Sequence, residues 1–469
     1  MPRPHPVRRP AVAGLVLSCA LLTACGGFNL SMVVGDGIPH DGSFSTTSHE
    51  DGHVHRMMAW GRDGDGYRIE MNGAELPQLT PDDADFVLTG GGEVVLAEYV
   101  SDEEWKRLEL RHGPAGEERL FFVEGAPAPY DAEAVAWLAA TVPVMIDHLG
   151  VGASSRVPRL MAEGGLDAVL ADVERRETDG ARERYYEVAL AQPGLESADL
   201  DRVLRHAAEH VASDGHLADL LEEAVEDHPR DPLILAAVLD AAPFVESDAH
   251  LADVLETCLE DGAVRGETLS RVLRVAAREI QSDAHLADLL EDVVRDGDLR
   301  GAGGDAFVIA MEQVESDAHA ADVLEDLIER DGLEDAVLAD ILRRAGPRIE
   351  SDAHMADVLE ELPAHRLTEA GVRGAWLKCL ATVDSDAHAA DLLEDQVSSA
   401  EAPDVVADLV SATVREVRSD AHASDVLLEL RRAAVQDPRV AAALREAHAR
   451  MSSAYRRELE DRFGEETFE

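Results

Sequence analysis

Lysine is almost absent from this 469-residue chain, in which Lys106 and Lys378 are the only two. There are 42 Lys+Arg against 95 Asp+Glu, so the formal net charge is −53. A nucleic-acid binder needs a clustered basic surface to neutralise phosphates, so DNA, RNA and anionic lipid headgroups are poor partners for this chain. The acidic, lysine-poor composition is typical of a GC-rich genome or of a salty habitat, where excess acidic charge keeps proteins soluble.

Cysteine is scarce as well, with four in the chain: Cys19 and Cys25 near the N-terminus, then Cys258 and Cys379. The last two lie 121 residues apart. A disulfide needs Cα atoms within about 7 Å of each other, so we expect no disulfide between them. Both are predicted to be buried free thiols.

Several catalytic signatures are missing. The sequence has no Gly-rich phosphate loop after a strand, no Gly-x-Ser-x-Gly elbow, no Cys–His nucleophile pair and no calcium loop with EF-hand spacing. Hydrophobic residues still make up 46% of the chain, which is ordinary globular content, so the protein should fold. We expect it not to be an enzyme.

One string resembles a catalytic motif. His49-Glu50-Asp51-Gly52-His53 matches H-E-x-x-H, in which two histidines on one helical face bind zinc and the glutamate acts as general base. Here the string contains Asp-Gly and leads into a predicted strand at Val54, which argues against a helix. We therefore expect the string to be a chance match. The alternatives are a loose metal-binding loop that includes His55 and, weakest, a zinc peptidase.

The N-terminus carries an export signal. Arg3, Arg8 and Arg9 precede an apolar run from Ala11 to Leu22, which is too short to span a bilayer, and no other stretch approaches about 20 continuous apolar residues. Leu22-Thr23-Ala24-Cys25 resembles the bacterial lipobox, which implies cleavage before Cys25 and a diacylglycerol on its thiol. We therefore expect a lipid-anchored protein of the bacterial cell envelope, on the periplasmic face of the outer membrane or on the cell surface, that meets the membrane through this lipid only.

One phrase, Ser-Asp-Ala/Gly-His-x-Ala/Ser-Asp, recurs seven times at intervals of 34 or 35 residues. A fixed period in this range is the signature of a stacked helical array. Thr178-Asp179-Gly180 stands 35 residues before the first copy and indicates a degenerate additional repeat, which makes eight. The serines are predicted N-caps of one helix per repeat: Ser213, Ser247, Ser282, Ser316, Ser351, Ser385 and Ser419.

Two helices fit within each repeat. Leu251, Val254, Leu255 and Cys258 follow helical spacing in a first helix, and Asp in its first turn suits the positive end of the helix dipole. A second helix is predicted over Leu269 to Ile280. Neither helix can bury its apolar stripe alone, so successive repeats must stack into an elongated rod.

The repeats are similar to a known bacterial family. The segment from Val157 to Leu170, the Asp179 unit with Tyr185 and Tyr186, and the Ser-Asp units together resemble an extracytoplasmic helical repeat, related in form to HEAT and TPR arrays. That repeat is found in surface proteins and in the outer portions of membrane metallopeptidases of the β-lactam-sensor type. This chain departs from the family pattern, because Ala or Gly stands at its Tyr position and Leu, Ala or Met at its Lys position.

The segment before the repeats has another character. Short alternating runs separated by Asp-Gly and Gly-Gly predict an antiparallel meander. A helix is then predicted from Tyr130 to Leu149. The expected strands are Val54–Trp60, Tyr67–Met71, Asp85–Thr89, Glu93–Tyr99, Trp105–Arg111 and Glu118–Val123.

Each motif histidine precedes an aspartate by three residues, so each pair offers two neighbouring ligands to Zn²⁺, Ni²⁺ or Cu²⁺. Two ligands are too few for a tight site, and repeats stacked roughly 10 Å apart cannot share one ion. Three interpretations stay open: half-buried imidazoles held by groups of the neighbouring repeat, weak metal sites, and direct contact with a partner. In the first, neutral imidazoles would make acidification through about pH 6.5 loosen the array. The pairs are His216–Asp219, His250–Asp253, His285–Asp288, His319–Asp322, His354–Asp357, His388–Asp391 and His422–Asp425.

The expected fold class is α+β, a small antiparallel β-rich N-terminal module followed by an all-α solenoid of two-helix repeats. The expected function is a scaffold for binding an envelope protein, without a resident cofactor. The alternative is a metal-binding envelope lipoprotein that uses the His–Asp pairs. The expected segments are a signal peptide (1–24), the β-rich module (25–128), a helical linker (129–177), about eight repeats (178–436) and a C-terminal capping helix (437–469).

Overall fold

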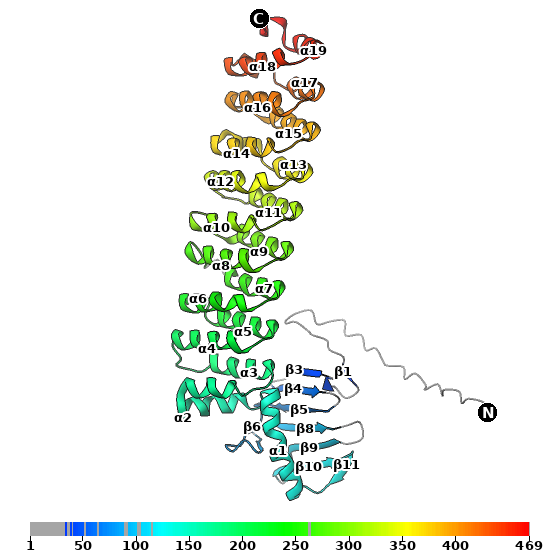
Figure 1. Cartoon of the computed structure of the whole chain (residues 1–469), viewed down its shortest axis with the longest axis vertical. Helices are drawn as coiled ribbons and strands as arrows, with labels where there is room; N and C mark the ends of the chain where they lie inside the picture. The colour runs from blue at the N-terminus through cyan, green and yellow to red at the C-terminus, as the bar shows by residue number, and fades with distance from the viewer. Residues whose placement is uncertain are drawn as a thin grey trace, which may run out of the picture.

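The fold was analysed in a computed structural model that describes residues 33–34, 38–39, 41–50, 53–62, 65–88, 92–100, 105–113, 116–260 and 264–468. An antiparallel sheet stands at one end of a long stack of paired helices (Figure 1). This α+β arrangement with a helical repeat confirms the expected fold class. The predicted signal peptide and Cys25 lie outside the described residues.

Seven strands form the main sheet, in the order β11-β10-β9-β8-β5-β4-β3, and all neighbours in it are antiparallel. Short turns join most of them, as a meander requires. The short strands β1 and β2 pair with each other, as do β6 and β7. The strands are β1 (Val33–Val34), β2 (Ile38–Pro39), β3 (Asp41–Glu50), β4 (His53–Arg62), β5 (Asp65–Gly73), β6 (Gln78–Leu79), β7 (Phe86–Val87), β8 (Glu93–Tyr99), β9 (Trp105–Gly113), β10 (Gly116–Val123) and β11 (Ala126–Ala128).

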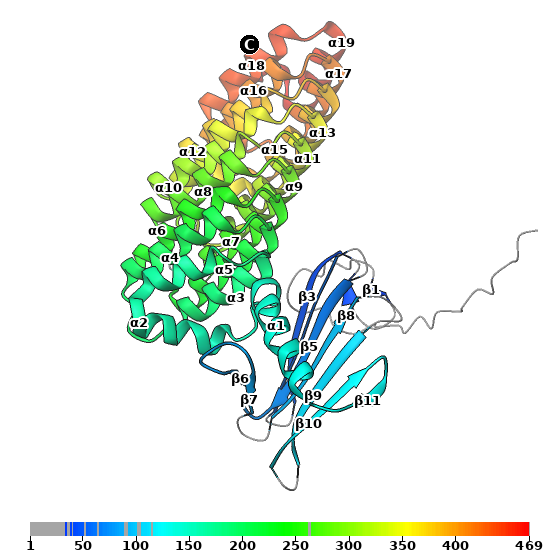
Figure 2. The same ribbon diagram turned by 60° about the horizontal axis from the view of Figure 1, so that its bottom comes forward.

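The sheet is covered on one face by α1 (Ala132–Leu149), which lies against it in Figure 2. Val94 and Leu96 of β8 alternate toward this face, because successive side chains of a strand point to opposite sides, and they pack in one core with Trp137 and Val142 of α1. Within the described residues, α1 is the one helix long and apolar enough to cross a membrane. Eight of its residues are buried in the protein, so its apolar character is explained by the core.

Two features of the sheet differ from the predicted strands. The long edge strand β3 was not predicted, because its sequence, Asp-Gly-Ser-Phe-Ser-Thr-Thr-Ser-His-Glu, is rich in Ser and Thr and lacks apolar alternation. The strand predicted over Asp85–Thr89 shrinks to β7, which pairs with β6 outside the main sheet. An edge strand is not held between two neighbours, so apolar periodicity detects it poorly.

The β6–β7 hairpin joins the sheet module to the helical array. Asp83 in its turn accepts hydrogen bonds from Arg156 and, at 2.7 Å, from Arg159, both on α2. Gly152 caps α2 with a φ of 78°, and a Cβ there would lie 2.2 Å from Leu79 Cδ1. Only glycine fits this close contact with positive φ.

Nineteen α-helices follow the sheet in the described part of the chain, with a few short 3₁₀ segments between them. From α3 to α18 they form eight successive pairs. The helices after α1 are α2 (Ala153–Val173), α3 (Asp179–Leu190), α4 (Ser197–His210), α5 (Asp214–Asp227), α6 (Pro232–Ala241), α7 (Asp248–Leu259), α8 (Glu267–Glu279), α9 (Asp283–Asp296), α10 (Ala302–Met311), α11 (Asp317–Glu329), α12 (Asp335–Ala345), α13 (Asp352–Glu360), α14 (Ala370–Leu380), α15 (Asp386–Ser399), α16 (Pro403–Glu416), α17 (Asp420–Leu428), α18 (Pro438–Arg450) and α19 (Ser453–Phe463).

The helices stack in two layers (Figure 1). Odd-numbered helices from α3 form the first-helix layer, in which α5 contacts α7 and α7 contacts α9, and even-numbered helices form the second-helix layer. One continuous apolar core runs between the layers, and in it Trp376, Phe307 and Tyr185 are fully buried. Each amphipathic helix thus buries its apolar stripe against its pair and against both neighbouring repeats.

The end of the chain differs from the single capping helix predicted over 437–469. Two helices are present there, α18 and α19. Helix α19 packs on α17, so it closes the first-helix layer while α18 closes the second. Each of the two helix layers needs a terminal helix with a polar outer face, and a single capping helix cannot cover both layers.

The two remaining cysteines are buried free thiols, as predicted. Cys258 lies on α7 and Cys379 on α14. Burial raises the pKa of each thiol to about 12, so both stay protonated and unreactive at neutral pH.

A carboxylate at the start of each first helix ties one repeat to the next. The aspartate after each motif serine accepts hydrogen bonds from backbone N–H groups just before the next first helix, 32 to 34 residues further along the chain. Asp317, for example, accepts from Glu350 N at 3.2 Å and from Ser351 N at 2.7 Å. We call this contact the aspartate bridge. Its members are Asp179, Asp214, Asp248, Asp283, Asp317, Asp352, Asp386 and Asp420.

Replacing Asp317 by alanine is expected to lower the free energy of unfolding by about 1–3 kcal/mol, because two backbone N–H groups lose a charged acceptor. Asp322→Ala on the same helix is the matched control. Asp322 is exposed, so its removal should change stability by no more than about 0.5 kcal/mol. Urea denaturation of the three proteins measures the difference, and equal losses for both variants would contradict a bridging role.

Candidate functional site

The motif serines stand at the N-caps of α5, α7, α9, α11, α13, α15 and α17, as the sequence predicts. In the last five of these helices the serine side chain accepts a hydrogen bond from the backbone N–H of the motif histidine, at 3.4 or 3.5 Å. Each cap therefore fixes where the helix begins, and with it the face on which the histidine and the next aspartate lie.

All seven motif histidines are half-buried between successive first helices. A Cβ placed on Gly215 would lie 3.6 Å from Nε2 of His250, so the imidazole packs directly on the helix of the preceding repeat. This contact leaves room for Gly or Ala, but for no larger side chain, at position 215. The other repeats carry Ala249, Ala284, Ala318, Ala353, Ala387 and Ala421 at the corresponding position.

The motif His–Asp pairs do not all come together. Among the described ion pairs, His354 and Asp357 are the one motif pair within 4.0 Å, at 3.9 Å. His216 instead contacts Glu183 of the preceding repeat, with Nδ1 2.9 Å from Oε2. Glu183, His216 and Asp219 offer ligand atoms that all lie within 4.8 Å of one another.

This three-residue cluster has perturbed acidities. The hydrogen bond that His216 donates to the Glu183 carboxylate raises the pKa of His216, against the effect of burial. Burial and the Glu183 charge raise the pKa of Asp219. The imidazole of His216 is thus favoured in its protonated form.

Acidic side chains line the first-helix layer from α5 to α17. The motif aspartate is exposed in every repeat, and a glutamate follows it one turn later in six of the seven. We call these thirteen residues the carboxylate ladder: Asp219, Glu222, Asp253, Glu256, Asp288, Glu291, Asp322, Glu325, Asp357, Glu360, Asp391, Glu394 and Asp425.

Acidic residues of neighbouring repeats affect the pKa values of ladder glutamates. Burial, followed by the charges of Asp219 and Asp253, raises the pKa of Glu222 to about 7. Burial and the charges of acidic residues on α7 and α9 raise the pKa of Glu256 to about 7 in the same way. The pKa values of Glu291, Glu325 and Glu394 are raised for the same two reasons.

The positive charge lies largely elsewhere. Arg205 and Arg271 both pair with Asp240, and Arg344 pairs with Asp305, all in the second-helix layer. Ion pairs of arginine thus link successive second helices. The carboxylates of the ladder, in contrast, have mainly other carboxylates as their charged neighbours. The two faces of the rod therefore differ strongly in electrostatic character.

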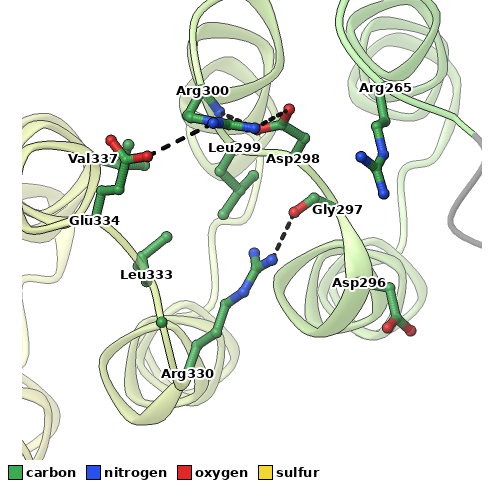
Figure 3. A pocket seen from close by; sticks show the side chains of 11 residues that line it. Arg265, Asp296, Gly297, Asp298, Leu299, Arg300, Arg330, Leu333, Glu334 and Val337 are labelled. Atoms are coloured by element: carbon green, nitrogen blue, oxygen red, sulfur yellow. Dashed lines mark hydrogen bonds and ion pairs between the residues drawn. The ribbon is translucent and has the colours of Figure 1, made fainter.

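A cavity of about 320 Å³ lies among the α7–α8, α9–α10 and α11–α12 loops (Figure 3). Arg300 there pairs with Asp298 at 2.7 Å and faces Glu334 at 3.7 Å. Arg330 donates to the carbonyl oxygen of Gly297 at 2.8 Å. These contacts connect neighbouring repeats, which gives both arginines a structural role.

The H-E-x-x-H string does not form a zinc-peptidase helix. His49 and Glu50 end strand β3 and His53 begins β4, with Glu50 opposite His53 in the antiparallel register. Two histidines on adjacent strands cannot present a helical i, i+4 pair of ligands, so this motif lacks its required context.

One group of metal-ligating side chains was missed in the sequence. Glu174, His206 and His210 offer ligand atoms within 4.8 Å of one another, at the start of the array. The spacing of four residues between the two histidines was the available signal, because it places them on one face of a helix. Glu174 is 32 residues away from His206 and only the packing of α2 on α4 brings it near.

The raised pKa values predict a fold that is more stable in mild acid. A carboxyl with a pKa of about 7 in the folded state and about 4.5 unfolded contributes stability that is complete below pH 4.5 and is lost as pH rises through 7. The raised pKa of His216 acts in the same direction. We expect a higher melting temperature at pH 5.5 than at pH 7.5, the reverse of the loosening expected from neutral imidazoles.

The double variant Glu222→Gln with Glu256→Gln should reduce this pH dependence, since amides do not titrate. Glu315→Gln is the control, because Glu315 is exposed and lies outside the ladder. A wild-type melting temperature that falls at pH 5.5, or an unchanged slope in the double variant, would refute the assignment.

Comparisons with known proteins give no relative for this chain. No family model matches it, and neither a curated protein nor a solved structure does. The antiparallel sheet module followed by paired helices is consistent with a helical repeat, and that architecture is what is established.

Proposed function

We propose that this chain is a lipid-anchored protein of a bacterial cell envelope whose helical array is a non-enzymatic scaffold for a partner protein. The signal-like N-terminus with Cys25 supports the anchor, and the resemblance of the Ser-Asp repeats to extracytoplasmic surface proteins supports the location. The carboxylate ladder carries the proposal for a binding surface, since it is long and regular and its aspartates are exposed.

The ladder favours a basic partner. The pKa values of Glu222, Glu256, Glu291, Glu325 and Glu394 are raised because burial partly withdraws these carboxyls from water and other carboxylates lie close by. A partner surface bearing Lys and Arg would relieve this repulsion on binding and would be steered toward the ladder from a distance. The seven-fold repetition offers such a partner many equivalent contacts, which multiplies weak individual ion pairs.

The anchor is tested by Cys25→Ser. A serine hydroxyl cannot form the thioether to diacylglycerol, so the variant should leave the membrane fraction and appear in the soluble fraction of the envelope. The wild-type chain should carry the mass of the lipid on a peptide that begins at Cys25. An unmodified wild-type peptide, or a variant that stays in the membrane, would refute the anchor.

The scaffold surface is tested by photo-cross-linking in cells. A photoreactive amino acid in place of Asp357 on the ladder should give one discrete protein adduct, whereas the same amino acid in place of Glu312 in the second-helix layer should not. Both positions are exposed, so accessibility is matched. Equal labelling from both positions would contradict a role for the ladder.

A matched pair of triple variants then separates specific contact from net charge. Asp253→Asn, Asp288→Asn and Asp322→Asn together should weaken binding of the cross-linked partner about tenfold or more, at up to about 1 kcal/mol for each lost ion pair. The control is the triple change Glu267→Gln, Glu312→Gln and Glu401→Gln, outside the ladder and with the same change in charge.

Metal binding by the motif is the second candidate function. The geometry of Glu183, His216 and Asp219 favours it, because three potential ligands meet there. The cluster is also acidic, and a divalent cation would compensate its charge. This candidate requires that Zn²⁺ binding is lost when His216 is replaced by alanine.

A further inference from the structure

The second-helix layer begins with a cluster that the repeat motif does not include. Glu174 caps the C-terminus of α2, and His206 and His210 lie one turn apart on α4. The two imidazole rings are stacked with their centres 4.0 Å apart. Both histidines therefore point the same way from α4, toward Glu174. The rings are nearly parallel, so to share one ion at least one of them would turn until both lone pairs converge.

The hydrogen bonds of His210 fix its tautomer. Its Nδ1 lies 2.8 Å from the carbonyl oxygen of His206. A carbonyl oxygen can only accept, so Nδ1 carries the proton and donates it. Nε2 of His210 is then an unprotonated lone pair, which is the form in which imidazole binds a metal.

His206 is supported from behind by a buried tyrosine. Its Nδ1 lies 2.6 Å from the Tyr186 hydroxyl, which also lies 3.3 Å from the His206 carbonyl oxygen. With the proton on Nδ1, the imidazole donates to the tyrosine oxygen and the hydroxyl donates to the carbonyl, so every group is satisfied. Nε2 of His206 is then also a lone pair, 3.3 Å from a carboxylate oxygen of Glu174.

Two acceptors that face each other at this distance need a cation between them. In the metal-free chain a proton on Nε2 can serve, with the Tyr186 hydroxyl turned to donate to Nδ1. When a metal ion binds Nε2 of His206, the proton leaves Nε2 and is carried on Nδ1 instead. The Tyr186 hydroxyl then turns to donate to the carbonyl oxygen of His206. No proton leaves the site in this exchange, because His206 stays a neutral imidazole throughout.

We propose that Glu174, His206 and His210 form a binding site for Zn²⁺ or a divalent ion of similar preference. Zn–N bonds of about 2.0–2.1 Å in a tetrahedron place neighbouring ligand atoms about 3.3 Å apart. The Glu174–His206 contact has this length, and the third ligand atom is within 4.8 Å of both. Imidazole and carboxylate ligands suit this ion, and the hydrogen bond of each Nδ1 is the support that metal-binding histidines require.

The surroundings allow the ion to enter. The Glu174 side chain is 56% exposed and that of His206 is 16% exposed, so the cluster lies at the surface. Arg182, the cation nearest to Tyr186, is held by Asp179 at 2.7 Å. Three protein ligands leave a fourth position for water or for a group of a partner. The bound ion would tie the second half of α2, after the kink at Gly165, to α4.

This site is independent of the proposed scaffold function and of the motif His–Asp pairs. The test is titration of the purified full chain with Zn²⁺ alone by calorimetry after removal of metals, and with Co²⁺ alone by visible absorption. We expect one Zn²⁺ bound with micromolar or tighter affinity and the absorption bands of tetrahedral Co²⁺. Zn²⁺ should also raise the melting temperature.

His210→Gln and Glu174→Gln should each weaken Zn²⁺ binding at least tenfold and abolish the rise in melting temperature. Tyr186→Phe should weaken it about 10–100-fold without removing a ligand. The controls are His216→Ala, which removes a potential ligand from the Glu183–His216–Asp219 cluster, and His365→Ala, which removes an exposed histidine. Both should bind Zn²⁺ as the wild type does. Metal-free melting curves of His210→Gln and the wild type should coincide, which shows that the variant folds.

The proposal is overturned if the wild type binds Zn²⁺ no more tightly than millimolar, or if His210→Gln binds it as the wild type does. Loss of binding in His216→Ala with retention in His210→Gln would assign the ion to the motif cluster and also overturn the proposal. The scaffold function is unaffected by either result, because its test uses the ladder variants.

Discussion

The aspartate bridge is the contact on which the array depends. Each bridge joins the start of one first helix to the chain just before the next first helix, so it fixes both the separation and the rotation of successive repeats. An ionised acceptor on backbone N–H groups is stronger than a neutral one and is directional. Because apolar packing between helices is not directional, it cannot select one register alone. The bridge therefore converts a row of similar helix pairs into one rod.

The same register creates the electrostatic asymmetry of the molecule. Once first helices are stacked with the motif in phase, Glu222 lies near Asp253 of the next repeat and Glu256 near Asp288 of the repeat after it, and the carboxylates form a ladder. In the other layer arginine pairs with aspartate across repeats, as Arg271 does with Asp240. Surface ion pairs add little stability individually, so this division of charge shapes the electrostatic field of the rod more than it stabilises the fold.

The junction between sheet module and array is built differently from the repeat joints. Asp83 of the β6–β7 hairpin holds two arginines of α2, and Glu174 at the other end of α2 meets the histidines of α4. Charged contacts thus occur at both ends of one helix. Gly165, with a φ of 68°, kinks α2 between these two sets of contacts. A metal tie at Glu174 would therefore hold the second half of α2 to the first repeat.

The sequence by itself determined the repeat, its period and its N-caps, because a phrase that recurs at constant spacing needs no tertiary information. It also indicated the meander and the buried thiols through local alternation and apolar context. Only the tertiary structure decided the second role of Asp317 and its counterparts, the edge strand β3, the second helix at the C-terminus, and the meeting of Glu174 with His206. Each of these depends on a partner some 30 residues away or on a neighbour in a sheet, and local periodicity carries no information about such contacts.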